Sequence, residues 1–232
     1  MKPLGHKAYG SIPHLPNSRL GPGDYCCHEG QARIATEKAR DRHDRVIVTE
    51  KLDGSNVAVA NVGGVIEALG RSGYRAASSP HEQHQIFAAW VRSRDWSTLP
   101  LGYRVSGEWL QMAHGTLYEV TDPLIGFDVF DVNNKRIPHD AARVIMADLG
   151  IPGAHILSDG APMSVPDAIA ALGPYGHHGA KEAVEGAVWR IERKGAFDFL
   201  CKYVRPDKID GKYFPQISGK PEVSMWRMGA DQ

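Results

Sequence analysis

The sequence predicts an α+β fold, in which strands joined by tight turns are combined with a few short helices. The turn signal is clearest at Gly63-Gly64, because two glycines between the apolar runs 57–62 and 65–69 are typical of a two-residue hairpin. Helices are indicated where apolar residues recur every three or four positions, and strands where apolar and polar residues alternate. Further strands are expected at 46–48, 103–110, 124–132, 185–191 and 199–205, and helices at 34–43, 81–94, 139–150 and 165–172.

The composition is that of a globular protein, with 42% hydrophobic and 23% charged residues among 232. Lysine plus arginine and aspartate plus glutamate both number 27, which excludes nucleic-acid binding through bulk charge but leaves room for a local basic groove. The chain has no apolar run of about 18 residues that could span a membrane, and its start lacks a secretory signal. Three cysteines make no even disulfide framework, so we expect a reducing, cytoplasmic setting.

The helices are expected to alternate with the strands along the chain. Residues 1–33 are rich in glycine, proline and histidine, which favours turns and extended segments. The segment 34–43 has the composition of a short polar helix, whereas 81–94 is amphipathic. The segments 139–150 and 165–172 each end at a glycine, a common helix stop.

A reactive lysine is suggested by the stretch Glu50 to Asn56, Glu-Lys-Leu-Asp-Gly-Ser-Asn. The lysine sits between an apolar strand and a tight polar turn, so its amine lies at a strand end that a phosphate can approach. Lys51 is therefore a candidate nucleophile, since a lysine forms covalent intermediates when its surroundings remove its proton. Because Asp-Gly is also a common hairpin signature, the alternative is a surface hairpin with a solvated lysine.

Four other charged residues stand in or beside predicted strands and are candidates for a functional role. Arg71, after the hairpin, is either exposed or a bidentate phosphate clamp. Glu108, in a β-forming stretch, either lies on an exposed strand face or accepts from a ribose hydroxyl. Glu185 stands at the start of a strand, and Lys202 lies among apolar and aromatic residues.

Alternation assigns several side chains to a face of their strand. Glu185 is expected on the face that carries Trp189. Phe127 and Phe130 fall on opposite faces of the strand at 124–132, so one of them is expected in the core and the other as a stacking platform.

In chain order the motifs are Lys51-Leu-Asp53-Gly54-Ser55-Asn56, Arg71-Ser-Gly, Gly107-Glu108, Phe127-Asp128, Glu185-Gly186 and Lys202. This order resembles the covalent nucleotidyltransferases, most closely the ATP-dependent RNA ligases of the nick-sealing (RNA ligase 2-like) branch, from about residue 45 to 205. The segment Ile12-Pro13-His14-Leu15-Pro16 is also similar to segments that precede the lysine motif in such ligases. The resemblance implies a nucleotidyltransferase core of two mainly antiparallel sheets flanked by helices, with a nucleotide cleft between them. We expect one adenylyltransferase domain over 1–232, with 1–44 as an N-terminal extension and without a C-terminal accessory domain.

The resemblance implies a role for each residue around the nucleoside. Glu50 would recognise adenine through its backbone, and Phe127 would stack on the base. Phe130 is the reserve candidate for stacking, because the repeated Phe-Asp leaves the alignment ambiguous by three residues. Glu108 and Arg71 would hold the ribose.

The same resemblance implies the chemistry at the phosphates. Lys51 would attack the α-phosphate of ATP, releasing pyrophosphate and forming a lysyl-AMP phosphoramide. The AMP would then activate an RNA 5′-phosphate, which a 3′-hydroxyl attacks. Asn56 would contact the reacting phosphate region, Glu185 would bind Mg²⁺ or Mn²⁺, and Lys202 would neutralise the α-phosphate.

Lys51 must lose its proton to react, and a free lysine titrates near 10.4. A nearby cation, either Lys202 or the metal, is expected to lower that pKa. In the family, the final motif usually carries two basic residues separated by one residue. This chain departs from that pattern, because the positions two before and two after Lys202 are Leu200 and Val204. Arg205 or Lys208 is the candidate for the missing charge.

Two rival functions share the first step, namely DNA ligation and GTP-dependent RNA capping. A non-catalytic nucleotide- or RNA-binding module is an alternative of another class, which intact Lys51, Glu185 and Lys202 argue against. The expected partner is RNA with 5′-phosphate and 3′-hydroxyl ends. The chain is expected to be a monomer, with an accessory RNA-repair protein as a possible second partner.

Overall fold

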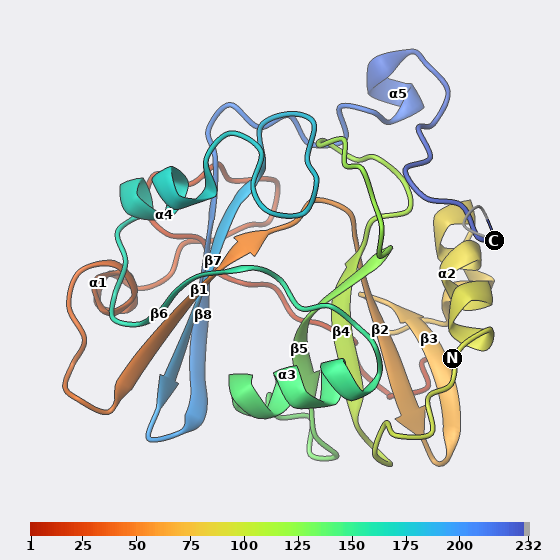
Figure 1. Cartoon of the computed structure of the whole chain (residues 1–232), viewed down its shortest axis with the longest axis horizontal. Helices are drawn as coiled ribbons and strands as arrows, with labels where there is room; N and C mark the ends of the chain where they lie inside the picture. The colour runs from red at the N-terminus through yellow and green to blue at the C-terminus, as the bar shows by residue number, and fades with distance from the viewer. Residues whose placement is uncertain (230–232) are drawn as a thin grey trace.

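Two four-stranded antiparallel sheets form the body of the chain, which the computed structural model describes over residues 1–229 (Figure 1). The first sheet has the order β6-β1-β7-β8, made of β6 (Ile156–Gly160), β1 (Asp44–Lys51), β7 (Gly186–Arg193) and β8 (Ala196–Val204). The second has the order β3-β2-β4-β5, made of β3 (Val65–Gly70), β2 (Ser55–Val62), β4 (Arg104–Trp109) and β5 (Leu124–Phe130). The α+β fold with two mainly antiparallel sheets is therefore confirmed.

The chain passes from one sheet to the other directly after Lys51. Strand β1 ends at this lysine in the first sheet, and β2 begins at Ser55 in the second. Only three residues, 52–54, make the crossing. The candidate nucleophile is thus placed where the two sheets meet.

Each sheet has its own apolar core, closed by short helices. The first core surrounds Trp189 and includes residues of α1 (Glu29–Thr36) and α4 (Val165–Leu172). The second surrounds Trp109 and includes residues of α2 (Glu82–Arg92) and α3 (His139–Asp148). A 3₁₀ turn (Ala76–Ser78) leads into α2, and the short α5 (Pro215–Ser218) stands apart at the edge of the molecule (Figure 1). Among residues 1–229, no helix is long and apolar enough to cross a membrane.

The expected helix at 34–43 is wrong, because α1 starts earlier and ends at Thr36. His28 caps its N-terminus in a capping box with Gln31, which fixes the start five residues before the predicted one. The following turn is held by carboxylates, since Asp44 accepts from Arg40 and Arg193 before β1 begins. The strand β6 and the helix α5 had no predicted counterpart.

Candidate active site

A cavity of about 1050 Å³ lies between the two sheets, and residues of both line it. All eight site residues expected from the sequence line this cavity, namely Glu50, Lys51, Asn56, Arg71, Glu108, Phe127, Glu185 and Lys202. The motifs, which are spread over about 150 residues of sequence, thus converge on one space.

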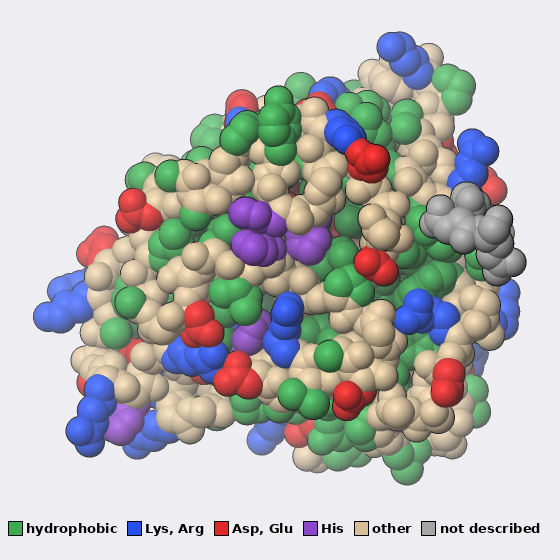
Figure 2. Space-filling view, in the orientation of Figure 1, with side chains coloured by type: hydrophobic (Ala, Val, Ile, Leu, Met, Phe, Trp, Pro, Cys, Tyr) green, Lys and Arg blue, Asp and Glu red, His purple; other side chains and the backbone are tan. Residues whose placement is uncertain are grey.

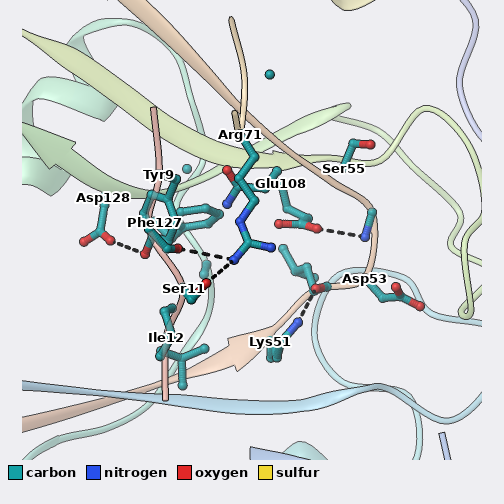
Figure 3. Close-up of a pocket in the computed structure, with 18 of the residues that line it drawn as sticks. Tyr9, Ser11, Ile12, Lys51, Asp53, Ser55, Arg71, Glu108, Phe127 and Asp128 are labelled. Atoms are coloured by element: carbon teal, nitrogen blue, oxygen red, sulfur yellow. Dashed lines mark hydrogen bonds between the residues drawn. The ribbon is translucent and has the colours of Figure 1, made fainter. Parts of the chain in front are cut away.

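Lys51 is held by carboxylates in this cavity. Its Nζ donates to Oε2 of Glu185 over 2.6 Å. It also donates to the carbonyl of Leu52 over 3.4 Å (Figure 3). Burial alone would lower the pKa of Lys51, but the carboxylates of Glu185 and Glu108 outweigh burial and raise that pKa well above the ordinary lysine value. The ammonium groups of Lys51 and Lys202 repel each other, but in the absence of nucleotide and metal the carboxylates dominate the charge around Lys51 and the net shift of its pKa is upward.

Glu185 reaches the cavity because it stands just outside its strand. The side chains of Ala187, Trp189 and Ile191 point into the first core, whereas Glu185 lines the cavity. The predicted common face for Glu185 and Trp189 is therefore wrong. A Cβ on Gly186 would lie 1.9 Å from the carbonyl oxygen of Tyr203, so glycine lets β7 and β8 approach closely immediately after the carboxylate.

Phe127 is the phenylalanine of the cavity, and Phe130 is not. The pairing of β4 with β5 shifts by one residue here, since Ser106 pairs with Asp128 but Gly107 pairs with Gly126. Phe127 is therefore the extra residue of a β-bulge, a feature that re-aims a side chain. Phe130 is buried, with the guanidinium of Arg104 stacked 3.7 Å over its ring.

Glu108 joins the lysine loop to the second sheet. Its Oε1 accepts from the backbone N–H of Gly54 over 3.0 Å (Figure 3). Burial, opposed by Lys51 and reinforced by Glu185, raises the pKa of Glu108 to about 7. Beside it, Oδ1 of Asn56 is buried and has no hydrogen-bond partner among the described residues, which leaves an acceptor free for a ligand.

Arg71 is tied to the N-terminal segment at the mouth of the cavity. Its Nη2 donates to Oγ of Ser11 over 3.2 Å, and its carbonyl accepts from the backbone N–H groups of Ala8 and Tyr9 (Figure 3). Tyr9 in turn packs edge-on against Phe127, with ring centroids 5.2 Å apart. The N-terminal segment thus forms one wall of the cavity.

Glu50 has a structural task besides any contact through its backbone. Its side chain is buried, and Oε2 accepts from the backbone N–H of His177 over 2.7 Å. This contact fastens the glycine-rich loop 174–179 to the end of β1. His177 stacks on His155, whose backbone N–H donates to His178, but no group of three metal-ligating side chains is found among residues 1–229.

Lys202 faces the cavity without a second cation beside it on β8. Arg205 is paired with Asp207, and Lys208 is buried against Asp53 at 2.6 Å and Thr116. Neither residue lines the cavity. The final motif therefore contributes a single charge.

The RNA ligase family model matches residues 44–204, about two thirds of the chain. The chain belongs to the RNA ligase family. It is similar in fold to an archaeal ATP-dependent RNA ligase (form 2), with TM-score 0.50 and 20% identity, covering 85% of this chain and 48% of that one. A Naegleria gruberi RNA ligase with PPi gives TM-score 0.52 and 15% identity, covering 92% and 58%.

A putative ATP-dependent DNA ligase from Aquifex aeolicus gives TM-score 0.54 and 16% identity, covering 85% of this chain and 49% of that one. This chain thus spans about half the length of the solved ligases it resembles. No curated protein matches its sequence. At these identities the similarity to solved structures establishes the nucleotidyltransferase fold.

The cavity fits a divalent cation of the kind expected for the RNA ligase family. Mg²⁺ is usually held by one or two carboxylates together with substrate phosphates and water, not by a cage of protein ligands. Glu185 is a buried carboxylate bonded to Lys51, and Asp53 and Glu108 are acidic neighbours of that lysine.

Several residues of the cavity were not expected from the sequence. Tyr9, Ser11 and Ile12 come from a segment without periodicity, so no local signal marks them. Arg190 lines the cavity from β7 and pairs with Asp128 and Glu192 beneath it. Alternation along β7 away from Trp189 is the signal that could have revealed it.

Proposed function

We propose that this RNA ligase family member seals RNA ends through an AMP adduct on Lys51. One observation supports the proposal above all others: the eight motif residues line one cavity at the point where the chain crosses between the sheets. A chance match of short motifs would leave them scattered. The spacing of these motifs resembles most closely that of the nick-sealing branch of RNA ligases.

In the first step, the neutral amine of Lys51 attacks the α-phosphorus of ATP. A bond forms between Nζ and phosphorus, the bond from phosphorus to the bridging oxygen breaks, and pyrophosphate leaves. The proton that Lys51 must lose has an acceptor 2.6 Å away, Oε2 of Glu185. The carboxylate that holds the ammonium is thus also placed to receive its proton.

The nucleoside would lie between Phe127 and the end of β1. Phe127 offers its ring to the base from the bulge, and the edge-on contact with Tyr9 fixes that ring. Glu108 lies close enough to Lys51 to influence its charge, and Glu108 and Arg71 line the same cavity, so both would be placed to hold the ribose.

The phosphate end would be held by positive charge from this chain and by the cation. Glu185 would hold Mg²⁺ or Mn²⁺, which when bound supplies positive charge to the phosphate oxygens. Lys202 faces the same end of the cavity and stabilises negative charge as it develops on the α-phosphate.

An RNA end would enter along the wall built by the turn between β3 and α2. The residues from 70 to 84 that line the cavity include arginines, serines and histidines, and none is acidic. Arg71 can contact a phosphate, whereas the guanidinium of Arg75 is already paired with Glu67. His84 bridges the hydroxyls of Ser55 and Ser79. In the second step the 5′-phosphate takes the AMP from Lys51, and in the third a 3′-hydroxyl displaces AMP to form the phosphodiester.

Sealing of DNA ends is the second candidate, because a putative DNA ligase shares the fold and the first step is the same. Four nicked duplexes, with RNA or DNA on each side of the nick, separate the two when each is incubated with ATP and Mg²⁺ or Mn²⁺. We expect joining where the strand ends are RNA. Joining of DNA alone, or labelling by GTP alone, would replace this proposal with DNA ligation or RNA capping.

The control variants are Lys51→Ala and Lys181→Ala. Lys181 is an exposed lysine that pairs with Glu119 far from the cavity lining. Lys51→Ala should abolish joining, whereas Lys181→Ala should leave it unchanged. Folded protein that joins no substrate and takes up no label would favour a binding module.

We further propose a reducing, cytoplasmic setting, which the free state of all three cysteines supports. A monomer whose grip on a duplex is helped by an accessory RNA-repair protein agrees with the neutral net charge. Acidic and basic side chains are interspersed over the face shown in Figure 2, without a continuous basic stripe.

A further inference from the structure

The N-terminal segment pairs with β8 at Lys202. The backbone N–H of Leu15 donates to the carbonyl of Lys202 over 2.7 Å, and the N–H of Lys202 donates to the carbonyl of Pro13 over 2.9 Å. Lys202 is therefore held on both sides of its backbone by residues that lie before position 44, where the family match begins.

The same segment supplies side chains that lead to the Lys202 ammonium. His14 is buried, and its Nδ1 lies 2.6 Å from Oγ of Ser18, which accepts from the backbone N–H of Val204. The other ring nitrogen of His14, Nε2, faces Asp24. That Nε2 lies 3.0 Å from Oδ2 of Asp24, in electrostatic contact but without the alignment of a hydrogen bond.

Asp24 stands between the histidine and the lysine. Its Oδ1 lies 3.7 Å from Nζ of Lys202, and its Oδ2 accepts from the backbone N–H of Gly21 over 3.0 Å. Asp24 is not part of the cavity lining, so it can act on a bound nucleotide only through Lys202.

Lys202 needs a carboxylate partner to stay protonated, because burial and the neighbouring cations favour its neutral form. Burial and the ammonium of Lys51 lower the pKa of Lys202, and Arg71 adds to this effect. Asp24 and Glu185 act in the opposite direction. Glu185 is engaged with Lys51, which leaves Asp24 as the carboxylate dedicated to Lys202.

We propose that His14 and Asp24 are positioning residues, which hold the Lys202 ammonium in place for the α-phosphate. This inference rests on the proposed function. It identifies the side chains that position Lys202, the single cation of the final motif. Ser18 holds His14 through Nδ1, His14 lies in electrostatic contact with Asp24, and Asp24 faces the ammonium of Lys202 from 3.7 Å. No second lysine on β8 can compensate if this support is lost.

Asp24→Asn tests the proposal, since asparagine keeps an acceptor for Gly21 and removes only the charge. The measurement is the single-turnover rate of AMP transfer from ATP to the full-length protein, from pH 6 to about pH 10. We expect the rate to fall roughly 10- to 100-fold, as for a misplaced catalytic group, with little change in KM for ATP. The alkaline limb of the profile should move to lower pH, and Asp24→Glu should restore part of the rate.

Asp210→Asn is the matched control, because Asp210 pairs with Arg19 of the same segment at an exposed site. It should leave both the rate and the profile unchanged. A readout without nucleotide is the ¹³C NMR titration of dimethylated Lys202, whose pKa should be lower in Asp24→Asn than in the parent protein.

A parent-like rate and alkaline limb in Asp24→Asn would overturn the proposal. So would a rate loss without movement of the limb or of the NMR pKa, because that is the mark of a merely structural aspartate. If the parent protein itself takes up no AMP, the proposed function fails, and this inference fails with it.

Discussion

At the scale of single residues, the site is organised by carboxylates around one amine. The cluster of Glu185, Glu108 and Asp53 keeps Lys51 protonated until a ligand changes the balance of charge. A protonated lysine is not a nucleophile. The pairing with Glu185 therefore keeps the amine of Lys51 unreactive and also holds it in position. The sequence analysis identified both residues of this pair and the cation that lowers the pKa of Lys51, but it did not predict that the carboxylates outweigh that cation.

Phe127 and Phe130 give a prediction that separates a binding role from a packing role. Phe127→Ala should raise KM for ATP about 10-fold, because base–aromatic stacking contributes roughly 1–3 kcal/mol. Phe130→Ala should instead lower the free energy of unfolding by about 3–5 kcal/mol, since its ring is buried under Arg104. Adenylation kinetics and urea denaturation of both variants show which phenylalanine binds the base and which one packs in the core. The reverse pattern would assign the base platform to Phe130.

Glu108 gives a prediction about pH. Its folded-state pKa, about 7, lies above the ordinary value of 4.5, so the folded protein binds this proton more tightly than the unfolded chain. The resulting stability, on the order of 3 kcal/mol, is fully present below pH 4.5 and is lost as the pH rises through about 7. Urea denaturation across this range should show less loss in Glu108→Gln than in the parent. An identical slope would place the titration elsewhere.

At the scale of elements, irregular points in the strands bring the functional side chains into the cavity. The bulge in β5 turns Phe127 away from the alternating pattern, and Glu185 escapes the pattern by preceding β7. Simple alternation correctly separated Phe127 from Phe130, but it could not say which of them faces the cavity. It placed Glu185 on the wrong face, because it assumes that the pleat extends unbroken to residue 185. The helix α4 was predicted at its observed bounds, since Ser164 caps it and Gly173 ends it.

Gly186 gives the prediction at this scale. Gly186→Ala should lower the free energy of unfolding by roughly 1–3 kcal/mol, because the new methyl group would meet the Tyr203 carbonyl. It should also slow adenylation by shifting Glu185. Gly70→Ala is the matched control, since a Cβ there meets nothing within 4 Å and φ is not positive. Equal stability of the two variants would contradict the close approach of β7 and β8 at Gly186.

At the scale of the whole molecule, two sheets are joined directly after Lys51, and the N-terminal segment forms one wall of the cavity between them. The family resemblance predicted both sheets and the eight site residues, because each motif carries its own local pattern. It could not predict the contacts of Tyr9, Ser11 and Asp24, because they depend on how the N-terminal segment runs over the assembled sheets. Long-range packing of an aperiodic segment leaves no local signal.

The charge balance of the whole chain predicts weak salt dependence of RNA binding. The chain has equal numbers of acidic and basic residues. Seven lysines and arginines line the cavity, but Lys51, Arg75 and Arg190 are paired with carboxylates, which leaves four for phosphate contacts. A plot of log K against log salt should therefore have a slope between about −2 and −4, at roughly 0.7–0.9 per phosphate contact. Titration of a labelled nicked duplex at several salt concentrations measures it. A slope near −8 would indicate a basic surface beyond this cavity.

The most direct measurement of the central claim is intact-mass analysis of the protein after incubation with ATP and Mg²⁺ or Mn²⁺, followed by peptide mapping. We expect a mass increase of one AMP, located on the peptide that contains Lys51 and absent from Lys51→Ala. The adduct should be lost on addition of 5′-phosphorylated RNA. An adduct on another residue, or none on folded protein shown to be free of bound AMP, would contradict the account.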